Sequence, residues 1–494
     1  MIHFTLLSKR LFFGFSFMFL VFSTPGQLFA ARYIVDSKTS SDVWKSAEWA
    51  NYPASPSCTP CTPETALKNA ISGDIVYFRA GQGGNYDIKP ANSWSIPKWN
   101  PEHSGTEASP IIFRNYPGEM PVLRNINTGC KEGDDSCKNS IIGSNGKDYI
   151  IWDGFQLGIT SDKLLEGNPQ VRFDTCRGCV FRNCKMYIVN AYIDLYKSNY
   201  TGIYLMGVYD TSIKNNFITG GTQMSEEDGN PPSSAILMYL ATNTLVENNS
   251  IIRTACGISD KTTARNNIYR NNFLYEPGTH GIWFGGSSGE GSSAKGIKVY
   301  QNIIVSTNPY AKLIWIDDDS AGEGHGDDFE VYNNVLYGPQ LIRAGIEADD
   351  ATNDRYWNNI IWGGFKEGNF RFLGPNSQPD YMDYNIYYVT QKFSIRVYEP
   401  NTAYYTTLSS WQASGELVGG ANPDVHSVYV DPGLVNPGGM TPDDYRLTKT
   451  SPARGTGRNQ QDIGAYPLGD GQTLIGYYSA EKPTPPSNMR IERY

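Results

Sequence analysis

Short apolar strands separated by polar turns recur along most of the chain. Residues 244–270 contain one complete unit: a strand ends at Asn248-Asn249, an apolar pair follows, and after a turn Gly257-Ile258 opens a second strand. The same pattern begins again at Asn271-Asn272. A unit of this size that repeats along a chain is typical of a solenoid.

Eight asparagines occupy the same position in successive units, 23 to 33 residues apart. Stacked coils pair as parallel strands about 4.8 Å apart, so an amide side chain at one corner can hydrogen-bond to its neighbours above and below. The sequence lacks the leucine consensus of a horseshoe and the blade signatures of a propeller. We therefore predict an all-β fold, a right-handed parallel β-helix. The aligned residues are Asn183, Asn216, Asn249, Asn272, Asn302, Asn334, Asn359 and Asn385.

Local signals place the two ends of the solenoid. Residues 73–467 carry the strand pattern, and we assign them to the β-helix. Within residues 31–72, Thr62 can cap a short helix, Pro63 fits its first turn and Gly73 follows its end. We expect this N-terminal helix to cap the first coil, whose open edge would otherwise recruit other strands. Residues 468–494 contain a proline-rich stretch and are predicted to be a tail or linker.

Residues 1–30 are typical of a signal peptide. Lys9 and Arg10 precede an apolar run, 11–22, that is too short to span a bilayer comfortably. No later segment is apolar enough for a membrane span, so we expect a secreted or periplasmic protein, and a monomer. Eight cysteines in an exported chain favour disulfides, with buried thiols as the alternative, and Cys176-x-x-Cys179 lacks the second ligand pair that a zinc site needs.

The net charge narrows the class of partner. A formal charge of −9 argues against nonspecific binding to nucleic acid. An anionic partner would need a local cluster of cations or a bridging metal ion.

Four segments resemble exported proteins of the right-handed parallel β-helix superfamily. The segments are 73–81, 109–119, 451–455 and 462–466. That superfamily includes pectate, alginate and chondroitin lyases and mannuronan epimerases. The resemblance implies the fold across residues 70–467, and it leaves the activity open because one fold serves many functions.

One coil is similar to the lysine-bearing coil of the alginate/chondroitin lyase family. The similar residues are Ser259-Asp260-Lys261, Asn267 and the segment 269–273. This resemblance implies a catalytic role for Lys261. The position of that family's catalytic arginine falls near Trp283 here, and residues 249–257 hold no carboxylate for its calcium site.

The strand before each asparagine strand brings charged and aromatic residues onto one face. Successive side chains of a strand alternate between faces. If the aligned isoleucines, such as Ile282 and Ile314, point inward, the residues one and three positions later point outward. Arg343 enters this outward set because we align Ile342 with Ile314. The set includes Tyr204, Tyr239, Lys261, Trp283, Trp315, Asp317, Arg343 and Arg371.

This predicted face suits a linear acidic polysaccharide. Large exposed aromatic side chains are costly unless they bind something, and their rings can stack on sugars. An arginine can fork onto a carboxylate. We therefore predict that Trp283, Trp315, Arg371 and Tyr204 bind the substrate.

The reaction that fits a uronate polymer is β-elimination. It requires neutralisation of the carboxylate, a base for the C5 proton and an acid for the leaving oxygen. Lys261 is the candidate base if burial or nearby cations lower its pKa. Arg343, Arg371 or a calcium ion can neutralise the uronate, and Tyr239 or His280 can supply the acid. The alternative for Lys261 is a solvated lysine in a turn.

An acidic, glycine-interrupted segment follows Trp315 and predicts a possible calcium site. Its candidate ligands are Asp317, Asp318, Asp319 and Glu323. Hard oxygen ligands on a flexible loop suit calcium, whereas the alternative is a charged, solvated excursion between coils.

Other functions stay open at this point. A non-catalytic carbohydrate-binding or adhesin-like β-helix explains the repeats and the aromatic residues without any catalyst. A glycoside hydrolase would need two carboxylates that flank one bond, for which Asp260 and Asp317 are candidates. A uronate epimerase is a further alternative.

Overall fold

The protein is described here from a computed structural model. The described residues are 32–36, 61–80, 85–89, 96–126, 140–158, 170–188, 200–220, 233–285, 294–317, 327–374, 377–389, 393–398 and 402–469 of 494. The signal-peptide prediction and most of the predicted tail therefore lie outside the described residues. Among the described helices, none is long and apolar enough to cross a membrane.

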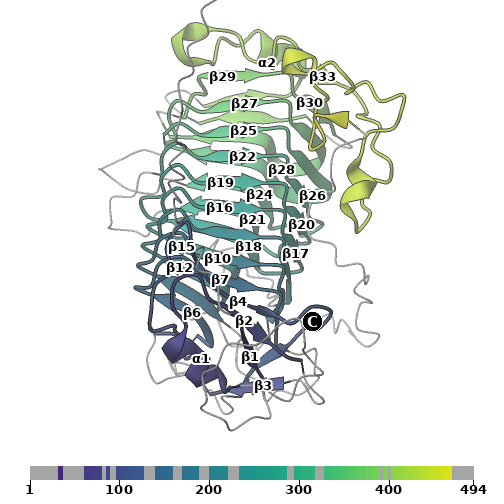
Figure 1. The fold of residues 1–494 in the computed structure, drawn as a ribbon. Helices are drawn as coiled ribbons and strands as arrows, with labels where there is room; N and C mark the ends of the chain where they lie inside the picture. Colours follow the sequence, from purple (N-terminus) through teal and green to yellow (C-terminus); the bar gives the residue numbers. More distant parts are fainter. Residues whose placement is uncertain are drawn as a thin grey trace, which may run out of the picture. The chain divides into compact units, whose positions relative to one another are not determined.

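Parallel strands stack into columns, as the repeat predicts (Figure 1). The first sheet forms one column and begins with β1, N-terminal to residue 73. Its strands, in spatial order, are β1 (Arg32–Val35), β2 (Ile75–Phe78), β4 (Ile111–Asn115), β7 (Ile150–Asp153), β10 (Val180–Arg182), β13 (Ser212–Lys214), β16 (Leu245–Glu247), β19 (Ile268–Arg270), β22 (Lys298–Tyr300), β25 (Glu330–Tyr332), β27 (Arg355–Trp357) and β29 (Tyr381–Asp383).

Two further columns complete each coil. The second column contains β3 (Asn85–Ile88), β5 (Val122–Asn125), β8 (Gln156–Leu157), β11 (Lys185–Ile188), β14 (Phe217–Gly220), β17 (Ser250–Ile252), β20 (Phe273–Tyr275), β23 (Ile303–Val305), β30 (Ile386–Tyr388) and β33 (Val428–Tyr429). The third column contains β6 (Ile142–Asn145), β9 (Val171–Asp174), β12 (Tyr200–Met206), β15 (Ser233–Tyr239), β18 (Cys256–Lys261), β21 (His280–Gly285), β24 (Lys312–Asp317), β31 (Ile395–Val397) and the antiparallel β32 (Ala403–Tyr405). The long strands β26 (Val335–Asp349) and β28 (Ile360–Leu373) run through both columns.

The predicted asparagine ladder stands at the corner between the first and second columns. From Asn216 to Asn385 each buried amide donates to the next one, with N···O distances of 3.0 to 3.1 Å. Each carbonyl oxygen also accepts from a backbone N–H of the preceding coil, as Asn302 Oδ1 does from Asn272 N at 3.0 Å. The prediction is wrong at Asn183, because Cys184 occupies the ladder position and Asn183 adopts the left-handed turn beside it, with φ 55°.

Apolar side chains fill the inside of the coils. The aligned isoleucines of the third column, including Ile258, Ile282 and Ile314, are fully buried there. A second cluster lies outside the second column, where Ile303 and Ile360 pack against Leu434 and Tyr445 of the C-terminal segment (Figure 1). That segment contains α2 (Leu408–Gln412) and the 3₁₀ turns η3 (Val418–Gly420), η4 (Pro442–Tyr445) and η5 (Arg458–Gln460).

The predicted N-terminal helix exists as α1 (Pro63–Asn69). Thr62 accepts a hydrogen bond from Thr65 N, and proline stands in the first turn, as expected. Ala66 and Leu67 pack into the main core. The helix has only seven residues, so its role as a cap of the first coil stays a prediction.

The described cysteines are buried thiols. Cys61, Cys176, Cys179, Cys184 and Cys256 are all free, so within the described ranges no disulfide forms. The remaining three, Cys58, Cys130 and Cys137, lie outside the described residues. The disulfide prediction is therefore not confirmed, whereas the alternative of buried thiols holds for these five.

One predicted register is wrong. Ile314 pairs with Ile346, not with Ile342, so Glu347 stands beside Trp315 where the sequence places Arg343. The cause is the long strand β26, which passes from the second column to the third with register shifts between Gly338 and Ala344. The alternation of inward and outward residues is still visible in the sequence beyond such an irregularity. The number of residues per coil changes there, however, so an alignment that assumes a constant number pairs the wrong residues.

Candidate functional site

The candidate site lies on the outer side of the third column. The isoleucines point into the core, so the residues one and three positions later face outward. His280 and Lys312 reach the same side, because they contact the outward rings of Trp283 and Trp315. Arg343 and Glu367 join them through ion pairs with each other and with Arg371. We call this surface the ionic face. Its members are Arg172, Asp174, Tyr204, Tyr239, Lys261, His280, Trp283, Lys312, Trp315, Asp317, Arg343, Glu347, Asp349, Glu367 and Arg371.

Two stacked indoles form the centre of the ionic face. Trp283 and Trp315 come from neighbouring coils, and their ring centroids lie 5.2 Å apart with an interplanar angle of 10°. His280 stacks against both, at 5.6 Å and 4.8 Å. Gly285 makes room for this arrangement, because a Cβ there would lie 2.5 Å from Trp283 Nε1. The ring faces are thus largely occupied by each other, which leaves the ring edges for a ligand.

The edges carry polar atoms without a partner. Trp283 Nε1, Trp315 Nε1 and His280 Nδ1 are buried, and none of them has a hydrogen-bond partner among the described residues. Leaving a buried polar group unpaired costs about 1–3 kcal/mol. Three such nitrogens on adjacent rings therefore mark a place that a ligand with hydrogen-bonding groups can complete.

Two lysines flank the indoles. The Lys261 ammonium lies 4.1 Å from the centroid of the Trp283 ring, and its side chain is 9% exposed. Within the described part of the chain, Lys261 makes no ion pair and no hydrogen bond through its side chain. The Lys312 ammonium lies 3.2 Å from the centroid of the Trp315 ring and 2.6 Å from Glu347 Oε1.

Glu347 begins a buried chain of alternating charges. Its other carboxylate oxygen accepts from Arg371 Nη1. The same guanidinium contacts Glu367 Oε2 at 2.5 Å, and Arg343 Nε lies 3.3 Å from that oxygen. Arg343 therefore joins the ionic face through Glu367 rather than through the register that the sequence suggests. At the other end, Arg172 Nη2 pairs with Asp174 at 2.7 Å, and its guanidinium lies 4.3 Å from the Tyr204 ring.

Burial shifts the protonation of this cluster. Desolvation lowers the pKa of Lys261, partly offset by the charges of Cys256 and Asp317. Desolvation lowers the pKa of Lys312 to about 8 despite the opposing effect of Glu347. The pKa of His280 falls well below its usual value through desolvation and then through Lys312, Arg343 and Lys261, so this imidazole is neutral. The site thus combines amines that deprotonate readily with a neutral ring.

Most predicted site residues come together, and the sequence missed two. Lys261, Tyr239, Tyr204, Trp283, Trp315 and Asp317 share the outer face in the predicted register. Lys312 and Glu347 were not predicted, although a lysine and a glutamate inside the apolar runs 311–316 and 344–348 are a usable signal. The Asp260 side chain, by contrast, points inward and accepts from Asn267 Nδ2 at 2.8 Å.

A metal site has little support among the described side chains. Asp317 pairs in register with Asp349, so two carboxylates stand on adjacent coils. In the described ranges, no group of three or more possible ligands is present. Asp318, Asp319 and Glu323 lie outside the described residues, and the calcium prediction stays open on them.

Comparison with known proteins supports the fold. A family profile described as "Right handed beta helix region" matches residues 150–336. No curated protein sequence matches the chain. The chain forms a right-handed parallel β-helix.

Solved structures are similar in fold only. The pectate lyase Pel9A is 11% identical with a TM-score of 0.48, over 88% of this chain and 96% of that chain. The A-module of the mannuronan C-5 epimerase AlgE4 from Azotobacter vinelandii is 11% identical with a TM-score of 0.47, over 66% of this chain and 83% of that chain. The GH136 lacto-N-biosidase from Eubacterium ramulus is 12% identical with a TM-score of 0.46, over 73% of this chain and 64% of that chain.

Proposed function

We propose that the protein is an exported enzyme that cleaves a uronate-containing polysaccharide by β-elimination at the ionic face. The single observation that carries the proposal is Lys261, a buried lysine with a lowered pKa, no ion-pair partner among the described residues, and a position beside three unpartnered ring nitrogens. An exposed lysine is protonated at neutral pH and is a poor base. Burial against Trp283 increases the fraction of free amine that can take a proton.

The chemistry follows from the placement of the groups. A uronate carboxylate can accept hydrogen bonds from Trp283 Nε1 and Trp315 Nε1, which lie on adjacent coils. Arg371, two coils beyond Trp315, can bind the carboxylate of another sugar of the same polymer. The contacts with the indoles favour charge on the carboxylate as Lys261 removes the C5 proton. The C4–O bond then breaks, a C4–C5 double bond forms, and the leaving oxygen takes a proton.

Tyr239 is the best proton donor to the leaving oxygen. It stands beside Lys261 in register on the adjacent coil. His280 is a poor candidate, because its lowered pKa leaves the imidazole neutral and without the imidazolium proton that a general acid donates. The described side chains offer no complete ligand set for calcium, and the proposed steps use protein groups alone.

The test is an assay for the unsaturated product. The purified chain is incubated with alginate, polygalacturonate or chondroitin sulfate, with and without calcium, and ultraviolet absorbance is followed. We expect Lys261→Ala to lose about 10²–10⁴-fold in rate, the usual contribution of a general base. The matched control is Lys298→Ala, an exposed lysine of β22 on the first sheet. Full activity in Lys261→Ala would contradict the proposal.

A non-catalytic carbohydrate-binding protein is the second candidate. It is favoured by one observation: Arg343 and Arg371 are already paired with Glu367 and Glu347, so much of the cationic charge is neutralised. Binding of acidic polysaccharide without any new product would support it. New reducing ends without absorbance would support a hydrolase, and altered uronate composition without cleavage would support an epimerase.

A further inference from the structure

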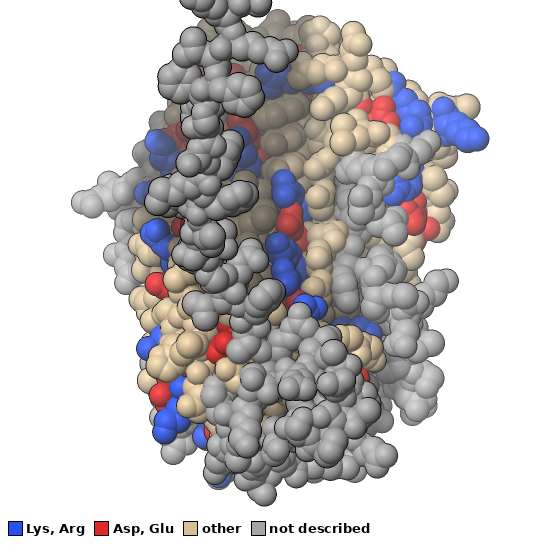
Figure 2. All heavy atoms as spheres, viewed as in Figure 1, with Lys and Arg blue, Asp and Glu red and all other residues tan. Residues whose placement is uncertain are grey.

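A second column of functional groups stands on the outer side of the first sheet, at the ends of its strands. In-register pairing stacks the last residue of each strand from β7 to β29. We call this the end column. Figure 2, in the same view as Figure 1, shows basic and acidic side chains alternating along a hollowed part of the surface. The members are Asp153, Arg182, Lys214, Glu247, Arg270, Tyr300, Tyr332, Trp357 and Asp383.

The charged half of the end column largely satisfies itself. Arg182 pairs with Asp153 at 3.0 Å, and Arg270 pairs with Glu247 at 2.7 Å. Arg270 Nη1 also donates to the hydroxyl of Tyr300 at 3.1 Å. Arg270 is therefore the residue at which the charged half of the column contacts the aromatic half. Two of the three cations of the charged half are thus neutralised within the column, whereas Lys214 has no carboxylate partner among the described residues.

The aromatic half is a stack of nearly parallel rings. Tyr300 and Tyr332 lie 4.8 Å apart with an interplanar angle of 6°, and Tyr332 and Trp357 lie 4.3 Å apart at 4°. All three side chains are half-buried. Because the ring faces cover one another, the edges meet the solvent, and these edges carry hydroxyl and indole N–H groups.

Arg458 completes this stack from the C-terminal segment. Its guanidinium carbon lies 5.1 Å from the centroid of the Trp357 ring and 4.8 Å from that of Tyr381. Its backbone N–H donates to Asn358 Oδ1 at 2.8 Å, which fixes the segment to the corner of the coil. Arg458 is exposed, and among the described residues it has no carboxylate partner. A guanidinium held on aromatic rings keeps its donors free to fork onto a carboxylate.

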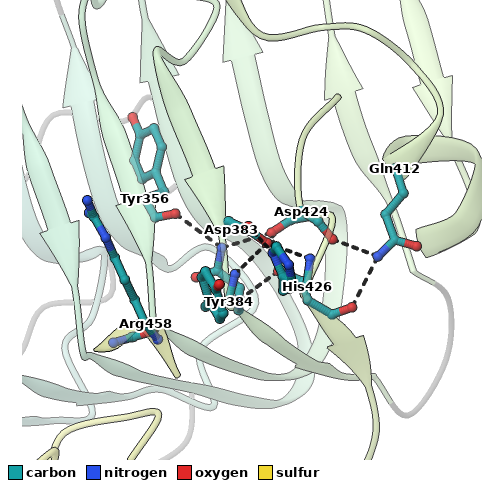
Figure 3. Close-up of polar contacts among 10 residues, drawn as sticks. Tyr356, Asp383, Tyr384, Gln412, Asp424, His426 and Arg458 are labelled. Carbon is teal, nitrogen blue, oxygen red and sulfur yellow. Dashed lines mark hydrogen bonds and ion pairs between the residues drawn. The ribbon is translucent and has the colours of Figure 1, made fainter. Parts of the chain in front are cut away.

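An oriented histidine stands next to this arrangement (Figure 3). Asp383 accepts from His426 Nδ1 at 2.7 Å and from the backbone N–H groups of His426 and Tyr384. The imidazole stacks on Tyr384 at 4.7 Å and 5°, and its side chain is 58% exposed. The carboxylate holds the proton on Nδ1 and leaves Nε2 as an acceptor toward solvent.

The turn that carries His426 is anchored in the core. Asp424 is fully buried and accepts from Tyr387, Trp411 and Asn385 at 2.6 to 3.0 Å. Gln412 donates to the backbone oxygens of Asp424 and Ser427 (Figure 3). The histidine is therefore presented by a rigid turn. Tyr381 lies between the two groups, because its ring is 4.8 Å from the Arg458 guanidinium carbon and it belongs to β29, the strand that ends at Asp383.

We propose that the aromatic half of the end column, with Arg458 and His426, is a second binding surface for an acidic saccharide. Arg458 takes a sugar carboxylate. The hydroxyl of Tyr332, the indole N–H of Trp357 and His426 Nε2 take sugar hydroxyls. At this surface a guanidinium beside aromatic rings, in a chain of net charge −9, suits the carboxylates of a sugar polymer better than the dense phosphates of nucleic acid. The inference rests on the first sheet and the C-terminal segment that packs beside it, and not on cleavage at the ionic face.

The experiment measures retention in native gels that contain polygalacturonate, alginate, or the same polymers after reduction of their carboxyl groups. All proteins carry Lys261→Ala, so that no cleavage at the ionic face disturbs the measurement. We expect Arg458→Ala to bind the acidic polymers about tenfold more weakly, the size of one charge-assisted hydrogen bond. Binding to the carboxyl-reduced polymers should be weak and unaffected.

The matched control is Arg177→Ala. Arg177 is also exposed and lies 5.7 Å from the Tyr209 ring, but it pairs with Asp210 at 3.7 Å. A second variant, Trp357→Leu, should weaken retention on both kinds of polymer.

Three results would overturn the inference: unchanged retention in both Arg458→Ala and Trp357→Leu, equal retention on reduced polymers, or equal retention on single-stranded DNA. The lyase assay can fail while retention in the gels still depends on Arg458. That result would contradict the proposed β-elimination and support this binding surface.

Discussion

The two outer faces of this β-helix use the same kinds of side chain and differ in burial. On the ionic face, Lys312 and Glu347 form an ion pair whose side chains are each 3% exposed. On the first sheet, Lys298 and Glu330 form a pair of similar length whose side chains are 46% and 24% exposed. The first pair lies in a low-dielectric environment that shifts the lysine pKa to about 8. In-register stacking produces columns of charge on both faces, but only desolvation makes a column chemically unusual.

The aromatic stacks repeat this contrast. The indole N–H groups of Trp283 and Trp315 are buried, and the described residues offer them no hydrogen-bond acceptor. The rings of Tyr332 and Trp357 stay half-exposed, so water can satisfy their edges. The buried face thus retains a deficit of hydrogen bonds that a bound ligand can fill. On the exposed face, a ligand gains affinity only where its contacts with the rings are more favourable than the hydrogen bonds that water already makes there.

The largest effect should come from Glu347→Ala. This change leaves Lys312 and Arg371 buried without their shared carboxylate. Removing one partner of a buried ion pair typically costs about 3–5 kcal/mol. We expect a loss of that size in the free energy of unfolding, measured by denaturant titration. A loss below about 1 kcal/mol would mean that the ionic face is as well solvated as the first sheet.

The next largest loss of stability should come from a substitution in the asparagine ladder, at the corner between the first and second columns. Asn302→Ala removes donors to Asn334 and to the Tyr269 carbonyl and an acceptor for Asn272. With several buried groups left unpaired, we expect a loss of about 3 kcal/mol in unfolding free energy. The exposed Asn422, which accepts one hydrogen bond from Gly415 N, provides the control, and its change to alanine should cost well under 1 kcal/mol.

The pH dependence of stability should separate the two faces more finely. The pKa of Lys312 is lowered from 10.5 to about 8, so between these values the unfolded chain binds more protons than the folded one. Stability from this residue therefore rises with pH across that window, by about 2 kcal/mol from pH 8 to pH 10. Lys312→Met should abolish this rise relative to the wild type, whereas Lys298→Met should keep it. If unfolding free energy changes with pH in the same way in all three proteins, the pKa of Lys312 is not lowered by burial, and its ammonium group is in contact with solvent.

The smallest effect should come from Glu330→Ala on the first sheet. Glu330 contacts Lys298 at 2.9 Å and Arg355 at 3.6 Å in a partly exposed setting. Exposed ion pairs contribute about 0–1 kcal/mol and are screened by salt. We expect a loss within that range that shrinks further at high salt. A salt-independent loss comparable to that of Glu347→Ala would remove the distinction between the faces.

The candidate site was predictable where the coil repeat is regular. Lys261, Trp283 and Trp315 stand in successive coils of similar length, and simple alignment places them on one face. The alignment fails at Arg343 because β26 turns the corner without a break and shifts register on the way. Alternation alone predicts that Asp260, two residues after the inward Ile258, points into the coil. The structure pairs it there with Asn267 and Tyr269, seven and nine residues later in the sequence.

By itself, the sequence determined the repeating unit, the asparagine corner and the fold class, because each of these depends on a local pattern that recurs in every coil. Only the tertiary structure decided which charges lie together and how deeply they are buried. Lys312 became a low-pKa lysine beside Glu347, and Arg458 met Trp357 from a segment about 100 residues away. Register around a corner and desolvation by neighbouring coils are long-range properties, and no local periodicity encodes them.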